Sequence, residues 1–174
     1  VITKLSLSQS FIEKLKEIDT KLNQKGNFLT LSESIPCLES AKEWEPKASK
    51  PKDRIETIKR SYQTNIKTLV AIRPLLPVIS DKELEEIVDS TKDYCYGYYS
   101  GPLYLKELNH PLIEKAGLEN LKIEKLQPHW MPKDNIFYKI EKEGQMNSLK
   151  NILQKNEKPL FEGAAEAIKY LKTI

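Results

Sequence analysis

Arg73 is the residue whose type and position most clearly indicate chemistry in this sequence. It follows a nearly continuous apolar run, Lys67–Ile72, and the prolines after it stop a strand because proline donates no backbone N–H. A charge is rarely placed beside such a run without a partner. A guanidinium binds carboxylate or phosphate through paired hydrogen bonds, so Arg73 indicates an anionic ligand.

Three further polar residues are predicted to lie at the ends of two other strands. Lys4 ends a strand predicted over residues 1–5, and Ser32 and Ser34 end a strand predicted over residues 28–34. The two serines share a parity, so they point the same way. The alternatives are a solvated lysine for Lys4 and ordinary strand-end capping for the serines.

Arg54 is the fifth position of interest, because it is expected in the first turn of a helix. A cation is mildly unfavourable there, which favours an anionic partner, and Glu45 is an internal alternative for that partner. Together, Lys4, Ser32, Ser34, Arg54 and Arg73 predict one rim that binds a ligand carrying a carboxylate or phosphate and hydroxyls.

The elements that must position these residues alternate between strands and helices. Because Lys67–Ile72 is apolar at both parities, that strand is expected to be covered on both faces, which is typical of a parallel sheet wrapped in helices. Strands are also predicted over 1–5, 28–34 and 94–99. Short connections make a series of right-handed crossovers, and ligands of such folds bind at the carboxyl ends of the strands. The predicted class is α/β.

Serines mark the expected helix starts, and the pattern changes after residue 105. The predicted caps are Ser10 with Glu13, Ser49 with Pro51, and Ser80 with Glu83. Residues 1–105 are predicted to form the βα unit. Residues 106–174 are predicted to form an α+β appendage that packs on the sheet, with helices over 110–117, 144–155 and 164–173 and a strand over 136–140.

Composition excludes several classes of function. A net charge of +3, 30% charged residues and a mean hydropathy of −0.54 indicate a soluble, cytoplasmic protein, and no apolar run approaches the roughly 20 residues of a membrane span. The lysines are interleaved with acidic residues, so charge does not indicate nucleic-acid binding. Cys37 and Cys95 are expected to be reduced core thiols, and His110 and His129 to be structural or exposed.

The tyrosines between residues 94 and 104 allow two interpretations. They would pack on covering helices, or they would stack on a ligand. The sequence contains no phosphate-binding glycine loop, no dinucleotide-binding glycine motif, no nucleophile elbow and no zinc-ligand spacing.

Short motifs over residues 1–105 resemble the later half of a radical S-adenosylmethionine (SAM) barrel, in the group similar to spore photoproduct lyase. They are Ile2–Lys4, Ser32–Pro36, Glu45–Ala48, Pro51–Ile55 and Ile72–Pro77. The resemblance implies a partial TIM-like half barrel. It implies that Lys4 and Ser34 contact SAM, that Arg54 and Arg73 position its carboxylate or the substrate, and that an adenosyl radical abstracts hydrogen from the substrate.

The resemblance also implies cofactors that this sequence does not hold by itself. The family's Cys-x3-Cys-x2-Cys motif for a [4Fe-4S] cluster would belong upstream, and Lys47 stands where the family usually has glycine. The chain starts at Val1, inside a predicted strand, so we expect an upstream half barrel or a partner chain. The alternatives are a stand-alone, non-catalytic α/β binding module and a TIM-like enzyme acting on a phosphorylated metabolite.

Overall fold

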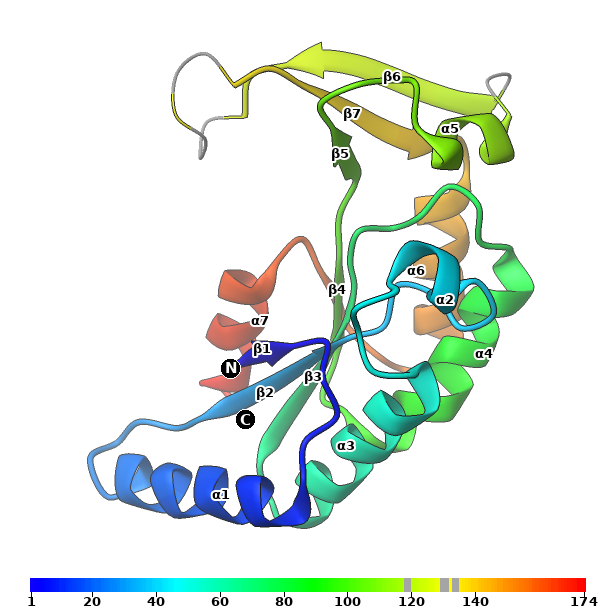
Figure 1. Ribbon diagram of the computed structural model, residues 1–174. Helices are drawn as coiled ribbons and strands as arrows, with labels where there is room; N and C mark the ends of the chain where they lie inside the picture. Colours follow the sequence, from blue (N-terminus) through cyan, green and yellow to red (C-terminus); the bar gives the residue numbers. More distant parts are fainter. Residues whose placement is uncertain (118–119, 129–131, 133–134) are drawn as a thin grey trace.

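A five-stranded parallel sheet forms the centre of the molecule in the computed structural model, which describes residues 1–117, 120–128, 132 and 135–174 (Figure 1). Its strands follow the order β1-β2-β3-β4-β8. Their bounds are Ile2–Thr3 for β1, Thr30–Ser34 for β2, Lys67–Ile72 for β3, Tyr98–Ser100 for β4 and Leu160–Phe161 for β8. The predicted α/β class and partial TIM-like half barrel are confirmed.

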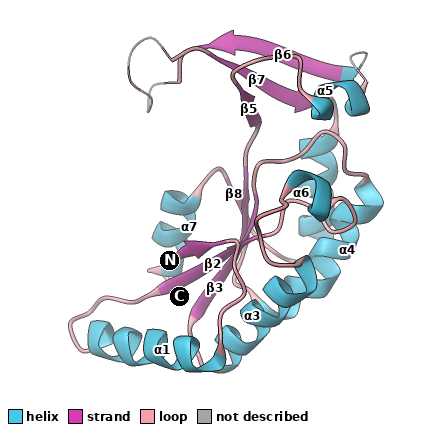
Figure 2. Ribbon diagram, in the orientation of Figure 1, coloured by secondary structure: helices cyan, strands magenta, loops and turns pink. Residues whose placement is uncertain are grey.

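Helices cover both faces of this sheet (Figure 2). On one face lie α1 (Gln9–Asn23), α3 (Pro51–Gln63) and α4 (Asp81–Thr91), and α7 (Ala164–Leu171) lies on the other. Residues of β3 alternate between the two: Val70 and Ile72 pack in the core beneath α3 and α4, whereas Leu69 and Ala71 pack with α7. This explains why β3 is apolar at both parities.

The helix starts agree with the prediction at one site and differ at two. Ser80 precedes α4 and accepts a hydrogen bond from the Glu83 N–H at 3.1 Å, as predicted. The cap of α1 is Ser8 rather than Ser10, because Ser8 Oγ accepts from the Phe11 N–H. Ser49 does not cap α3; its Oγ accepts from the Ser6 N–H, and Lys50 occupies the cap position.

α1 buries less of its apolar surface than the sequence pattern predicts. Ile12 and Leu15 are buried, but Phe11 is 46% exposed and Ile18 is 48% exposed. The helix lies at the β1 end of the sheet, where no further described strand pairs with β1. One flank of the helix therefore has nothing to pack against within the described residues.

A second, antiparallel sheet stands apart from the first, at the top of Figure 1, in the order β5-β7-β6. Its strands are β5 (Leu103–Leu105), β6 (Leu121–Leu126) and β7 (Phe137–Lys142). Further helices among the described residues are α2 (Ala41–Trp44), the 3-10 helix η1 (Lys92–Tyr94), α5 (Pro111–Ala116) and α6 (Gln145–Lys155).

The C-terminal segment does more than pack on the parallel sheet. Its β8 pairs with β4, in the register Tyr98 with Leu160 and Tyr99 with Phe161, and so supplies the fifth strand. The division near residue 105 stays a prediction. None of the described helices is long and apolar enough to cross a membrane.

Candidate functional site

Lys4, Ser34 and Arg73 lie along the same edge of the parallel sheet. β1 pairs with β2 in the register Ile2 with Ser32, and β2 pairs with β3 in the register Ser34 with Ala71. All three residues therefore end or follow parallel strands at their carboxyl ends, where ligands of parallel α/β folds bind.

Glu45 holds two of the predicted cations. Its side chain is only 5% exposed, its Oε1 lies 2.8 Å from Lys4 Nζ, and its Oε2 lies 2.8 Å from Arg54 Nη2. Arg54 is fully buried and also donates from Nη1 to the backbone oxygen of Ser34 at 2.5 Å. Arg54 thus links α3 to the end of β2. Its anionic partner is Glu45, the alternative within the chain that the sequence analysis left open.

The two serines are buried and serve local contacts. Ser34 Oγ donates to the Arg73 backbone oxygen at 3.2 Å, so it links the ends of β2 and β3. Ser32 lies near the hydroxyl of Tyr99 on the face covered by α7. Burial raises the pKa of the Tyr99 phenol, while Ser32 and the charge of Arg73 both oppose that rise.

Arg73 is exposed and lines a cavity of about 550 Å³, which we call the Arg73 cavity. Its Nη1 donates to the backbone oxygen of Glu162 at 3.1 Å. A Cβ at Gly101 would lie 3.1 Å from Arg73 Cζ, so the guanidinium rests directly against the glycine backbone. The cavity continues upward to Tyr104 and Lys139 of the antiparallel sheet.

A second cavity, of about 390 Å³, lies beside Lys4, and we call it the Lys4 cavity. Trp44 and His110 contribute rings to it, with centroids 6.4 Å apart, and leucines and prolines form much of the rest. Trp44 Nε1 is buried and has no hydrogen-bond partner in the described part of the chain. The Lys4 cavity thus offers an aromatic surface and an ion-paired ammonium, and one of its lining residues, Trp44, has a buried N–H without a partner among the described residues.

Glu33 is a buried carboxyl that the sequence analysis overlooked. It is fully buried in β2, and neither carboxyl oxygen has a hydrogen-bond partner among the described residues. Burial raises its pKa to about 9; Arg54 lowers the pKa and Glu45 raises it further. Its position between Ser32 and Ser34 places it on the opposite face of β2, and this parity was the one signal for it in the sequence.

The cysteines are buried, and His110 precedes a helix while its ring lines the Lys4 cavity. Cys37 and Cys95 are free and buried, as predicted, and burial raises their pKa values to about 12 and about 11. His110 precedes α5, and its Nδ1 accepts from the Leu112 N–H at 3.2 Å. His129 lies outside the described residues. Within those residues, no group of three His, Cys, Asp or Glu side chains could hold a metal ion.

The tyrosines divide between packing and the Arg73 cavity. Tyr98 is buried beneath α4, where its hydroxyl lies 2.8 Å from Thr91 Oγ1, and Tyr99 packs on α7. Tyr94 and Tyr96 contact the ring of Tyr62. Tyr104 alone of the five lines the Arg73 cavity among the described residues.

The parallel strands of the half barrel bring Lys4, Ser34 and Arg73 to one rim, at their carboxyl ends. Comparison with solved structures finds the same fold in a mutant form of spore photoproduct lyase, a radical SAM enzyme, with a TM-score of 0.53. Identity is 11%, over 88% of this chain and 47% of that one, so the chain spans about half the length of the enzyme. No protein-family model and no curated protein matches the sequence. The similarity shows a radical SAM-like fold.

Proposed function

We propose that this chain is the later half of a radical SAM enzyme and binds SAM and substrate at the carboxyl rim of its parallel sheet. The observation that carries the proposal is the placement of Lys4, Ser34 and Arg73 at that rim, in a fold similar to spore photoproduct lyase. When bound, SAM supplies a reactive adenosyl group for hydrogen abstraction, while the protein binds and orients the reactants.

SAM fits the Lys4 cavity by its chemistry. The rings of Trp44 and His110 would cover the adenine base, and a small rotation of the indole would let its buried, unpartnered Nε1–H donate to a ring nitrogen of the base. Lys4, which is 44% exposed, would bind the amino-acid carboxylate while Glu45 holds its position. Ser34 would act through Arg73, whose backbone oxygen accepts its hydrogen bond. Arg54, fully buried, would position Glu45 rather than touch SAM.

The [4Fe-4S] cluster does not fit this chain. Such clusters are held by several cysteine thiolates, and the sequence has two cysteines, both buried and with raised pKa values. We therefore propose that another polypeptide segment supplies the cluster ligands. The β1 edge would receive it, because no further described strand pairs with β1 and Val1, Ile2 and Leu5 are more than half exposed.

Titration calorimetry with SAM tests the binding step. We expect Lys4→Gln to weaken binding by about 10-fold, which corresponds to one lost charged hydrogen bond. Lys47→Gln, a neighbouring exposed lysine that lines neither the Arg73 cavity nor the Lys4 cavity, is the matched control and should leave binding unchanged. Undetectable SAM binding by the folded chain would contradict the assignment of the Lys4 cavity.

Anaerobic reconstitution with the cluster-bearing segment tests the chemistry. The expected product is 5′-deoxyadenosine. Its absence from a reconstituted, cluster-loaded assembly would count against a radical SAM enzyme even if SAM binds.

A stand-alone α/β binding module is the second candidate function. The observation that favours it is α7, which covers Leu69, Ala71 and Tyr99 on the face opposite α3 and α4 and so completes a second core without any other chain. This candidate predicts a monodisperse protein that binds no hydrophobic dye. The third alternative, an enzyme acting on a phosphorylated metabolite, predicts that phosphate binds at Arg73 and that SAM does not bind.

A further inference from the structure

We propose that the Arg73 cavity is the substrate site, and that it takes a small molecule with a carboxylate or phosphate group at one end and an apolar or aromatic body. The role of this cavity as a substrate site rests on the proposed function. The binding of such an anion does not, because it involves a different cavity from the one proposed for SAM.

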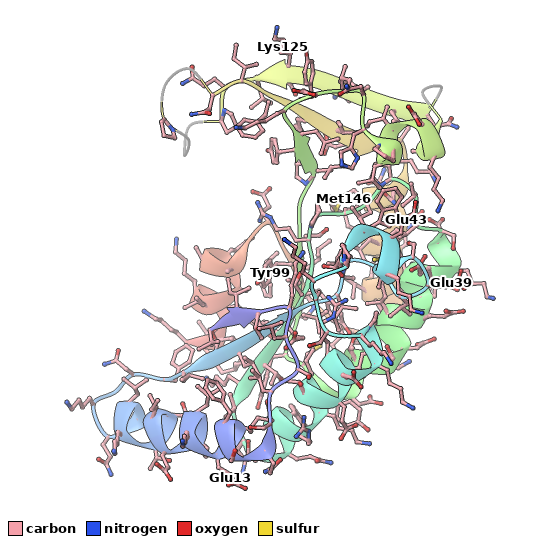
Figure 3. The ribbon with its side chains drawn as sticks, in the orientation of Figure 1. Glu13, Glu39, Glu43, Tyr99, Lys125 and Met146 are labelled. Carbon is pink, nitrogen blue, oxygen red and sulfur yellow. The ribbon has the colours of Figure 1, made fainter. Side chains whose placement is uncertain are left out.

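The Arg73 cavity lies between the two sheets. Its lower wall comes from the end of β3, the segment Ser100–Pro102 and the start of α7, and its upper wall comes from Tyr104 of β5 and Lys139 of β7. Figure 3 shows Met146, which also lines it, between the antiparallel sheet above and Tyr99 of the parallel sheet below. Its volume of about 550 Å³ is within the range of small-molecule sites.

Arg73 retains most of its capacity to bind an anion. A guanidinium has five N–H donors, and the recorded hydrogen bond of Arg73 uses one of them, toward the Glu162 backbone oxygen. No carboxylate in the described residues forms an ion pair with Arg73. Contact with Gly101 and the hydrogen bond to Glu162 restrict the guanidinium, which lowers the entropy lost when it binds an oxyanion bidentately.

The lining of the cavity carries as many carboxylates as cations, but Arg73 and Lys150 have no ion pair among the described residues. Lys139 is paired with Glu141 at 2.6 Å, and Glu166 accepts a hydrogen bond from the Glu162 N–H at 2.8 Å. Lys150 of α6, exposed and without an ion pair in the part of the chain described, adds a second available cation. Two of the three carboxylates in the lining are therefore engaged, whereas two of the three cations are free of carboxylates.

The walls away from Arg73 specify the rest of the ligand. Pro102, Met146, Leu160 and Phe161 present apolar surface, and Tyr104 adds an aromatic ring. A fully hydrated ion such as free phosphate would leave this surface uncovered. A monoester or carboxylate with an aryl or alkyl body would cover it and gain the free energy of apolar burial.

Side-chain NMR on the 174-residue chain tests the proposal. The sequence has three arginines, Arg54, Arg60 and Arg73, and two tryptophans, so the Nε–H signals of each type are separable. We expect phenyl phosphate and benzoate each to shift the Arg73 Nε–H signal saturably, with Arg54 and Arg60 unmoved. Benzamide, of the same shape but uncharged, should not shift it. The tighter of the two anions identifies the head group.

Three substitutions localise the binding. Arg73→Lys should weaken it by about 10-fold, because a lysine cannot bind the oxyanion bidentately. Gly101→Ala, which retains the charge but displaces the guanidinium, should weaken it several-fold, and Lys150→Gln by a smaller factor. Lys82→Gln, an exposed lysine of α4 that does not line the cavity, should have no effect. For the Arg73 variant, the backbone amides of Gly101 and Gly163 report binding.

Each failure has its own signature. If the Arg73 signal stays unmoved, or if benzamide shifts it equally, the proposal is overturned. Equal shifts at Arg60 and Arg73 would overturn it too, because they indicate non-specific association. SAM is added in a separate titration and is read from the Trp44 Nε1–H signal. If phenyl phosphate or benzoate shifts the Arg73 signal but SAM leaves the Trp44 signal unmoved, the SAM assignment is refuted and the anion site is retained.

Discussion

At the scale of single residues, two acidic side chains near the rim, Glu33 and Glu45, determine the electrostatic environment of the cations that suggested a site. Glu45 pairs with Lys4 on the surface and with Arg54 in the interior, while Glu33 is buried with both carboxyl oxygens free of hydrogen bonds to described residues. The sequence pattern named Glu45 as a possible partner of Arg54, and the structure shows that ion pair. The parity of Glu33, opposite to that of the serines on either side of it, was the one signal for it in the sequence, and parity alone does not distinguish a buried face of a strand from an exposed one.

Arg54→Met should destabilise the protein by about 3–5 kcal/mol, because it leaves the Glu45 carboxylate buried with one partner fewer and removes a donor to the Ser34 backbone oxygen. Urea unfolding measures the change. The control is Arg60→Met, whose partner Glu56 is exposed and 4.0 Å away and which also donates to the Leu7 oxygen; its cost should be about 1 kcal/mol. Equal costs would contradict the role of Arg54.

Glu33→Gln should change how stability depends on pH. The folded pKa of Glu33 is raised from 4.5 to about 9, so the folded state holds a proton that the unfolded state releases. The contribution of Glu33 is therefore fully present below about pH 4.5 and is lost as pH rises toward 9.

Chemical unfolding at several pH values checks this expectation. Near pH 5 the variant and the parent should be similarly stable, and by pH 8 the variant should be more stable by at least about 1 kcal/mol, since one proton contributes up to about 1.36 kcal/mol per pH unit. Parallel curves for the two proteins across this range would show that Glu33 is ionised in the folded state.

At the scale of elements, strands and helices were predictable, and their first and last residues were less so. The apolar run at Lys67–Ile72 identified β3 because burial on both faces marks the sequence directly. The fourth strand was predicted over 94–99, but residues 92–94 form a 3-10 helix and β4 covers Tyr98–Ser100. Tyrosines pack equally well in either conformation, so they gave no boundary.

The start of α1 offers a direct comparison between two serines. Ser8→Ala should cost about 1 kcal/mol, because the Phe11 N–H loses its side-chain acceptor. Ser10→Ala should change the stability by no more than about a few tenths of a kcal/mol, since Ser10 lies inside the helix, where the higher propensity of alanine offsets the loss of the contact with Ser8 Oγ. Thermal unfolding of both variants measures the difference, and the reverse order would restore Ser10 as the cap.

At the scale of the whole molecule, the β1 edge and the flank of α1 form one exposed apolar border. Its members are Val1, Ile2, Leu5, Phe11 and Ile18, each at least 46% exposed. Through its resemblance to half of a barrel, the sequence predicts two unpaired strand edges. It could not show that the other end of the sheet is completed by β8, because a strand of two residues has no recognisable pattern.

Exposed apolar edges of this kind promote association. We expect the chain to form larger species as its concentration rises, and Ile2→Lys to suppress them. Ile136→Lys, at an equally apolar position that is 50% exposed but remote from the β1 edge, is the control. Light scattering coupled to size-exclusion chromatography gives the masses of the species in solution. A monomer at all concentrations would contradict association through the β1 edge.

The pairing of β8 with β4 has a consequence for synthesis on the ribosome. Tyr98 and Tyr99 emerge long before Leu160 and Phe161, which complete their strand pairing, and before α7, which shields Leu69 and Ala71. Until the last turn of α7 has left the exit tunnel, this side of the nascent chain presents an apolar surface to chaperones and proteases. Translation that stops before residue 160 should therefore yield a product that is degraded rather than a smaller working unit.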